Sequence, residues 1–198
     1  QHMGAEGEVL VSTGDKVLKG QMLAGPHGLI SAAVHSPVSG KVAEITPHHF
    51  PHPSGLAGTC IVIENDHKDE WVERNPIGED YTNISSHELR NIVRDAGIVG
   101  LGGATFPAAV KQTEVGIETL ILNGVECESY ITSNDMLMRE RADDIIKGAK
   151  IIAHIIKAEQ CIIAIEDNKP EAIEAITRAV SRDGSEYITV QSVPTIYP

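Results

Sequence analysis

The segment GIVGLGGATFPAAVK, residues 97–111, combines several glycines with a Phe-Pro pair and a lysine. Residues without a Cβ let backbone N–H groups approach a ligand closely, and Lys111 can place a positive charge beside a phosphate. The spacing is close to the G-x-G-x-x-G dinucleotide fingerprint. However, Thr105 stands where the third glycine belongs, and the loop follows an expected helix instead of a strand. The residues therefore leave two interpretations open, a phosphate-binding loop or a turn between two elements.

Two further polar clusters come directly after expected strands. Asn123, Glu126 and Glu128 lie in NGVECESY at the end of one apolar run, and Glu166 ends the next run. Ligands in open α/β sheets bind outside the carboxyl ends of the strands, so these four side chains are candidates for contact with a ligand. The competing interpretation is a loop of solvated acidic residues and helix caps, with Asn168 as the cap of the following helix.

The elements that must position these clusters follow from the apolar pattern of residues 85–198. Apolar runs typical of buried strands alternate with segments of helical period, which predicts an α/β Rossmann-like domain with a parallel sheet. Gly97 is expected to end the first helix, and Pro170 to lie in the first turn of the last helix. The long helix between them has one apolar face, formed by Leu137, Ile145, Ala149, Ile152 and Ile156. In chain order these elements are a helix over 85–97, a strand over 118–124, a long helix over 133–158, and then a strand over 160–166, a helix over 167–184 and a strand over 187–193.

Residues 4–64 have a different pattern, in which glycine and proline break the apolar residues into short runs. This pattern predicts a small all-β domain. Two of its segments, GDKVLKGQ and SPVSGKV, resemble the paired hairpins of biotinyl and lipoyl carrier domains, which implies a barrel-sandwich hybrid fold. Residues 24–34 contain no lysine that could take a carrier cofactor. We therefore expect this barrel to serve in packing or docking and not to carry a cofactor. Residues 65–84, which include Trp71, are expected to form a linker, with Trp71 anchored on one neighbour.

Composition limits the possible classes of function. The 198 residues are 41% hydrophobic and contain no unbroken apolar run of about 20 residues, which predicts a soluble chain. The formal net charge of −12 argues against nucleic acid as a partner. The three cysteines lack a C-x-x-C spacing, so neither a disulfide framework nor a metal cluster is expected, and a reducing, cytoplasmic setting fits. The histidines His48, His49 and His52 are interpreted as surface turn residues and not as metal ligands.

Several unusual strings together resemble the C subunit of the Rnf-type electron transport complex, over nearly the whole chain. They are GLGGATFPAAVK, LILNGVECESYIT, IEDNKPEAI and PHPSGL. The second half more distantly resembles the NADH-binding flavoprotein subunit of respiratory complex I. The resemblance implies an NADH-linked oxidoreductase or translocase subunit that exchanges a hydride between NAD(H) and FMN and passes electrons onward.

The same resemblance implies the partners and the location. Other subunits of the complex would be partners, with ferredoxin or membrane electron carriers reached indirectly. The protein would lie peripherally on the cytoplasmic face of the inner membrane. Family members continue into a cysteine-rich region with two [4Fe-4S] clusters, which this chain does not contain.

Roles for individual residues also follow from the resemblance. Backbone groups of the glycine loop would line the flavin, Phe106 would stack on the dinucleotide, and Lys111 would lie near the flavin phosphate or ribityl chain. Asn123 and Glu126 would lie along the flavin, and Glu128 near the nicotinamide. The hydride exchange requires no protein acid or base, so no catalytic residue is expected. Complex I has an aspartate where this chain has Val125, which affects the hydrogen bonding expected for the ribityl chain. The lining residues of the loop would be Gly100, Gly102, Gly103 and Ala104.

Two other functions remain open from the sequence. One is a related flavoprotein that reduces a corrinoid cofactor. The other is a non-catalytic docking module, in which the barrel and the glycine loop bind partner subunits only.

Overall fold

The computed structural model describes residues 2–49, 55–101, 104–113, 116–126, 128 and 130–196, without the side chain of Glu79. The chain forms two compact units. The first comprises Gln1–Asp80 and Glu88–Lys111, and the second comprises Tyr81–His87 and Gln112–Pro198. Among the helices of the described residues, none has the length and apolarity needed to cross a membrane.

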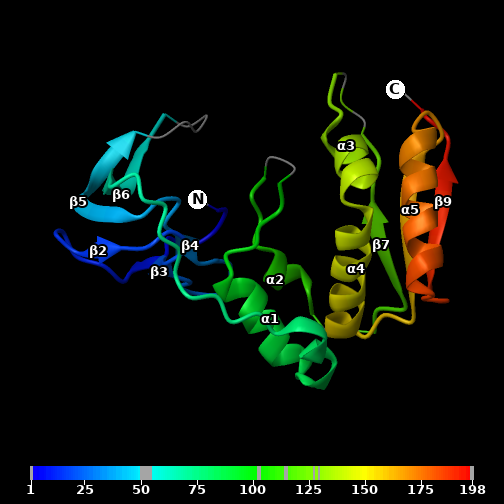
Figure 1. Ribbon diagram of the computed structural model, residues 1–198, viewed down its shortest axis with the longest axis horizontal. Coiled ribbons are helices and arrows are strands. Elements are labelled where there is room, and N and C mark those ends of the chain that lie inside the picture. Colours follow the sequence, from blue (N-terminus) through cyan, green and yellow to red (C-terminus); the bar gives the residue numbers. More distant parts are fainter. Residues whose placement is uncertain are drawn as a thin grey trace. The chain divides into compact units, whose positions relative to one another are not determined.

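The first unit contains a small barrel built from two three-stranded antiparallel sheets (Figure 1). Apolar residues on both sheets meet in a core formed by Val17, Leu23 and Val42, with Ile45 and Ile63 packed against it. The all-β architecture expected for this part of the chain is therefore confirmed. One sheet contains β1 (Glu8–Val9), β3 (Met22–Gly25) and β4 (Val34–His35), and the other contains β2 (Lys16–Val17), β5 (Gly40–His49) and β6 (Ala57–Asn65).

Strand β5 extends further than the sequence suggested. His48 and His49 were expected in a turn, but they lie at the end of β5 and pair with Gly58 and Ala57 of β6. Pro47 is compatible with this strand because β2 pairs only with the first two residues of β5, and so no neighbour on that side needs an N–H from Pro47. His52 lies outside the described residues.

The segment after β6 is held on the barrel around Trp71. The N–H of Lys19 donates to Glu70 O at 2.8 Å, and the N–H of Val72 donates to Lys19 O at 3.0 Å. Gly20 approaches the Trp71 ring so closely that a Cβ there would lie 3.0 Å from it. The expected anchoring of Trp71 is thus confirmed, and the barrel is its neighbour.

The glycine-rich segment begins where helix α1 (Ser86–Asp95) ends. Gly97 has φ +70°, and the N–H of Ile98 donates back to Val93 O at 3.3 Å. A residue without a Cβ adopts this left-handed conformation at little cost, so the predicted glycine cap is confirmed. The segment ends in a single turn, α2 (Ala108–Lys111).

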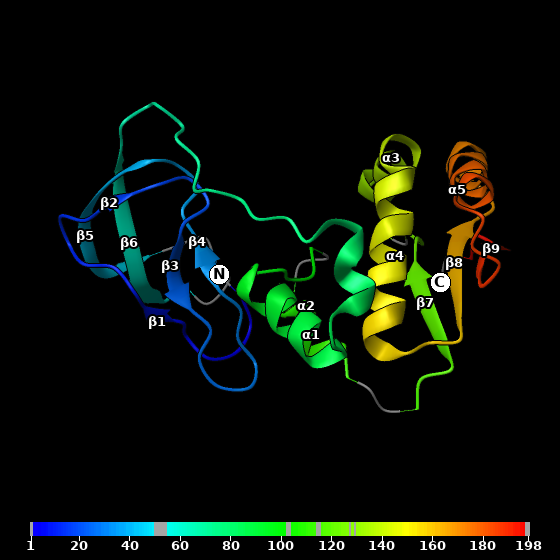
Figure 2. The ribbon, with the colours of Figure 1, turned by 60° about the horizontal axis from the view of Figure 1, so that its bottom comes forward.

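The second unit contains a parallel sheet in the order β7-β8-β9, with β7 at Thr119–Asn123, β8 at Gln160–Glu166 and β9 at Ile188–Val193 (Figure 2). The connections run through α3 (Ser133–Glu140), α4 (Ala142–Ile156) and α5 (Pro170–Asp183). A short 3-10 helix, η1, spans Gly78–Asn83. Residues Cys161, Ile163 and Ile165 of β8 are buried in one core with residues of all three helices. The predicted alternation of strands and helices and the parallel sheet are confirmed.

Two details of the second unit differ from the sequence prediction. The single long helix is divided at Arg141, where φ −128° and ψ 32° end α3 and start α4. Acidic residues favour a helix N-terminus, and the Arg141 Nε bonds Asp144 in the first turn of α4 at 2.7 Å, which stabilises a new start. The division changes the buried face, so Leu137 is 51% exposed while Ile146 is buried.

The start of α5 and the burial of β7 differ as well. Lys169, and not Asn168, is the N-cap residue of α5, and it makes no side-chain capping bond, whereas Pro170 takes the predicted first position. Ile121 in β7 is 62% exposed. Alternate residues of a strand face opposite sides, and the helices cover the side that holds the buried residues of β8. The run expected to be buried in β7 is therefore only half-buried, with Leu120 and Leu122 packed against the core.

Candidate functional site

The glycine loop is closed at its base by backbone pairing. Val99 and Pro107 form an antiparallel bridge, the N–H of Gly100 donates to Phe106 O, and the N–H of Ala108 donates to Ile98 O, both at 2.9 Å. The loop between these residues is thus a short lobe on a paired stem. Gly100 and Ala104 are exposed on it, and Gly102 and Gly103 lie outside the described residues.

An aromatic ring and a cation lie together beside this lobe. The Lys111 Nζ is 5.4 Å from the centroid of the Phe106 ring, and Lys111 is exposed at the last position of α2. A lysine ammonium over a ring face is attracted by the electron density of the ring. The pair offers a positive charge for a phosphate and an aromatic ring, half-buried, beside it.

At the carboxyl edge of the sheet in the second unit, β7 ends in a tight turn. Asn123 Oδ1 accepts the N–H of Val125 at 3.0 Å, and the N–H of Gly124 donates to Ala164 O of β8 at 2.8 Å. A Cβ on Gly124 would lie 2.8 Å from that oxygen and 2.9 Å from Met138 Sδ. Only glycine fits this turn without a shift of the backbone.

Glu126 follows this turn and is buried, with only 1% of its side chain exposed. One carboxylate oxygen accepts the N–H of Asn134 at 2.6 Å, and the other accepts the N–H of Asp135 at 3.3 Å. These two N–H groups belong to the first turn of α3, so the carboxylate satisfies donors that a helix start leaves unpaired. The Ser133 hydroxyl adds a longer contact of 3.5 Å.

Glu166 and Lys169 complete this buried group. The Glu126 N–H donates to Glu166 Oε2 at 3.3 Å, and the Lys169 Nζ lies 3.5 Å from Glu126 Oε2. Two carboxylates and one ammonium are thus gathered where β7 and β8 end. The sequence identified Glu126 and Glu166 as candidates but not Lys169. The only signal for Lys169 was its position directly before Pro170, the residue that starts α5.

Two other acidic residues at this edge behave differently. Glu128 is exposed. Asp167 Oδ1 accepts both the Thr195 hydroxyl at 2.7 Å and the Thr195 N–H at 3.1 Å. These hydrogen bonds stabilise the ionised form and hold the pKa of Asp167 below its usual value.

The predicted site residues therefore form two groups, one in each unit. The first unit brings together Gly100, Ala104, Phe106 and Lys111. The second brings together Asn123, Glu126 and Glu166 at the carboxyl edge of its sheet, with Glu128 exposed in the following loop.

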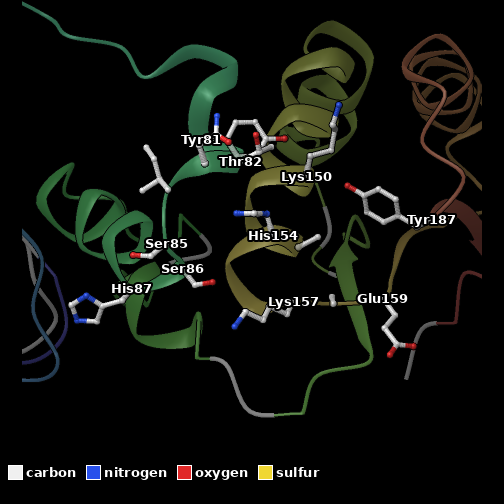
Figure 3. A pocket seen from close by; sticks show the side chains of 14 residues that line it. Tyr81, Thr82, Ser85, Ser86, His87, Lys150, His154, Lys157, Glu159 and Tyr187 are labelled. Atoms are coloured by element: carbon white, nitrogen blue, oxygen red, sulfur yellow. The ribbon is translucent and has the colours of Figure 1, made fainter.

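A cavity of about 1000 Å³ in the second unit was not anticipated from the sequence (Figure 3). Tyr81 and His154 line it with their rings edge to face, 5.9 Å apart. Lys150, also in the lining, pairs with Asp183 at 3.0 Å, and this hydrogen bond raises the pKa of Lys150. The lining includes Tyr187, directly before β9, so the cavity reaches the amino edge of the sheet and includes none of the predicted site residues. His154, expected in a core or interface, is half-buried here.

Among the described residues, no group of three or more His, Cys, Asp or Glu side chains is arranged to hold a metal ion. The exposed His48 Nε2 lies 3.1 Å from Glu44 Oε1.

Comparison with known proteins matches both parts of the chain. Residues 93–198 match the Nuo51 FMN-binding domain, and residues 1–68 match the RnfC barrel sandwich hybrid domain. The C subunit of the ion-translocating oxidoreductase complex of Haemophilus influenzae (strain PittEE) is 49% identical, covering 100% of this chain and 30% of the relative. The corresponding subunit from Serratia proteamaculans (strain 568) is 48% identical, covering 100% of this chain and 28% of the relative. The chain thus spans less than a third of the length of these two curated relatives.

Among solved structures, an NAD+-reducing [NiFe]-hydrogenase in the H2-reduced state shares 24% sequence identity, with a TM-score of 0.47 over 59% of this chain and 22% of that one. The domain match over residues 93–198 covers more than half of the 198 residues. The chain therefore belongs to the Nuo51 FMN-binding domain family and has an RnfC barrel sandwich hybrid domain in front of that domain.

Proposed function

We propose that the chain is the FMN- and NAD(H)-binding module of an Rnf-type electron transport complex, in which it exchanges a hydride between NAD(H) and FMN. The observation that carries this proposal is the match of residues 93–198 to the Nuo51 FMN-binding domain, which includes the whole glycine loop. With it, we infer that the parallel sheet and its helices are Rossmann-like in layering.

The described residues of the loop fit a flavin nucleotide. Lys111 offers an ammonium that suits a phosphate, and Phe106 offers a ring that suits a planar heterocycle or a nicotinamide dinucleotide. The paired stem fixes the backbone of Phe106, and α2 follows it directly with Lys111 at its end, so little backbone ordering remains to be done when a ligand binds. Bound FMN would supply the hydride chemistry, and the loop residues would bind and orient it.

The carboxyl edge of the second unit offers further candidates. Glu128 is exposed and is proposed near the nicotinamide, and Asn123, also exposed, is proposed along the flavin. Glu126 and Glu166 are buried and have protein partners. Contact of these two carboxylates with a cofactor stays a prediction, and the role that their contacts favour is to hold the start of α3 beside the ends of β7 and β8.

The complex subunits proposed as partners follow from the names of the relatives, and the location follows from the resemblance to the Rnf-type subunit. Those relatives are subunits of ion-translocating oxidoreductase complexes, so we propose other subunits of such a complex as partners of this chain. Ferredoxin or membrane electron carriers would be reached indirectly. The two [4Fe-4S] clusters are proposed for a region outside this chain, and the location for the cytoplasmic face of the inner membrane, peripherally.

A fluorescence-quenching titration with FMN tests the proposal. We expect saturable quenching for the 198-residue chain, and a dissociation constant about tenfold higher or more for Lys111→Ala, because a charged hydrogen bond to the phosphate is lost. Lys147→Ala is the matched control, since Lys147 is exposed on α4 and lies outside both groups of candidate residues.

Two outcomes would contradict the proposal. If Lys111→Ala binds FMN as tightly as the wild type, the loop is not the phosphate site. If neither this chain nor the full-length subunit binds FMN, the non-catalytic docking module becomes the better explanation. NADH bleaching of the flavin absorbance in the FMN-loaded full-length subunit would test the hydride exchange itself.

A further inference from the structure

The hairpin between β3 and β4 contacts the end of helix α1. The Arg94 Nη2 donates to Gly28 O at 2.7 Å, and the N–H of Ala33 donates to Arg94 O at 3.2 Å. Arg94 is therefore held by both its side chain and its backbone. Gly28 and Ala33 lie in the part of the chain that matches the barrel domain, and Arg94 lies in the part that matches the FMN-binding domain.

Gly97 shows how close this approach is. A Cβ on Gly97 would lie 2.5 Å from Ala33 O and 3.2 Å from His35 Nδ1, and the residue also has φ +70°. Any other residue would push the end of α1 away from the hairpin. Val99, which forms the bridge with Pro107 in the paired stem of the glycine loop, comes two positions later.

A second connection reaches the other side of the loop. The N–H of Ala5 donates to Ile30 O of the same hairpin at 2.8 Å, and the N–H of Met3 donates to Thr105 O at 3.1 Å. Gly4, between them, lies so close to the hairpin that a Cβ would be 2.0 Å from Ile30 O. The segment 3–5 thus joins the hairpin to the second half of the loop.

We propose that the barrel holds the glycine loop in place, and that Arg94 is a positioning residue that affects FMN binding through this loop. In carrier domains the corresponding hairpin presents a modified lysine, whereas in this chain the hairpin between β3 and β4 supports the glycine loop. The Arg94 Nε is buried without a hydrogen-bond partner, a desolvation cost that an arginine serving only as a surface charge would not incur. Holding the loop at both ends lowers the ordering cost of ligand binding. The effect on FMN rests on the proposed function.

The test compares Arg94→Ala with Arg90→Ala, a control one turn earlier on the same helix. Hydrogen–deuterium exchange of peptides covering residues 98–106 is measured without any cofactor, and FMN titrations are run in parallel on the 198-residue chain. We expect Arg94→Ala to speed exchange of the loop by about tenfold and to weaken FMN binding by about tenfold. Arg94→Lys, which can still donate to Gly28 O, should restore most of both properties. Exchange in β5 and β6 should stay unchanged.

The outcomes separate this inference from the proposed function. If the exchange rate of the loop is the same in Arg94→Ala as in Arg90→Ala, the proposal that the barrel holds the loop through Arg94 is wrong, whether or not FMN binds. Faster loop exchange with unchanged FMN affinity would overturn the positioning role of Arg94. If the wild type does not bind FMN, the proposed function fails while the exchange data still decide whether the barrel holds the loop. Should Arg94→Ala unfold, Gly97→Ala and the pair Arg94→Lys and Arg94→Gln give the same comparison.

Discussion

At the scale of single residues, Glu126 shows how a side chain picked out as a ligand can have a full set of protein partners. Its carboxylate accepts two N–H groups of α3 and lies beside the Lys169 ammonium. A buried carboxylate without such partners would be strongly unfavourable, so the partners explain why it can be buried at all. Glu128, two positions later, is exposed and is therefore the more accessible of the two to a ligand from outside.

We predict that Glu126→Ala lowers the free energy of unfolding by about 2–3 kcal/mol, because the start of α3 and the Lys169 ammonium both lose their partner. Glu126→Gln should cost less, since the amide oxygen can still accept an N–H of α3. Urea unfolding followed by circular dichroism measures both, with Glu128→Gln as the exposed control. Equal stability of Glu126→Ala and Glu128→Gln would contradict the capping role.

At the scale of elements, the turn at the end of β7 depends on Gly124. A Cβ there would come within 2.8 Å of Ala164 O in β8, a backbone atom that moves only with its strand. We therefore predict that Gly124→Ala destabilises the chain by about 2–3 kcal/mol through overpacking. Gly148 is the matched control, because it lies inside α4 with nothing within 4 Å of an added Cβ.

The same substitution at the control position, Gly148→Ala, should change the stability of the chain in the opposite direction. Gly148→Ala should stabilise the chain by up to about 1 kcal/mol, because alanine favours a helix interior and restricts the unfolded chain. Thermal and urea unfolding of the two variants measure the contrast. A stable Gly124→Ala variant would mean that the backbone of the turn can move aside.

The elements themselves could be predicted from the sequence to a large extent. The helical period, the apolar runs and the positions of Gly97 and Pro170 identified α1, β7, β8, α5 and β9, because these signals are local. The division at Arg141 was not predicted, since the apolar spacing continues through it and its backbone angles leave no trace in that pattern. The cap of α5 was assigned one residue too early for a related reason, because both Asn168 and Lys169 precede Pro170.

The candidate site was predicted only where it depends on local signals. Asn123 and Glu166 were placed correctly at strand ends because those ends can be located from the apolar runs, while their contact with a ligand stays a prediction. The pairing of Lys169 with Glu126 joins residues more than 40 positions apart, and that of Arg94 with Gly28 spans 66 positions. No spacing rule in the sequence reports such contacts, because the fold alone brings the partners together.

At the scale of the whole molecule, the net charge of −12 opposes the binding that we propose, because FMN is an anion through its phosphate. The field of the whole chain acts over long distances, whereas the contact of Lys111 with a phosphate acts over a few ångströms. Salt separates the two effects. The screening length falls from about 30 Å at 0.01 M to about 8 Å at 0.15 M, so distant charges lose influence before a direct contact does.

We therefore predict that FMN binds this chain more tightly as NaCl rises from about 0.01 to about 0.15 M, with a dissociation constant roughly threefold lower. Titrations in a buffer without phosphate measure this, and KCl in place of NaCl controls for effects of the individual ion. Lys111→Ala should keep the trend at weaker overall affinity, because the repulsion comes from the chain as a whole. A dissociation constant that rises with salt in the wild type and not in Lys111→Ala would show the reverse, namely that the local cation outweighs the summed acidic charge even at low ionic strength.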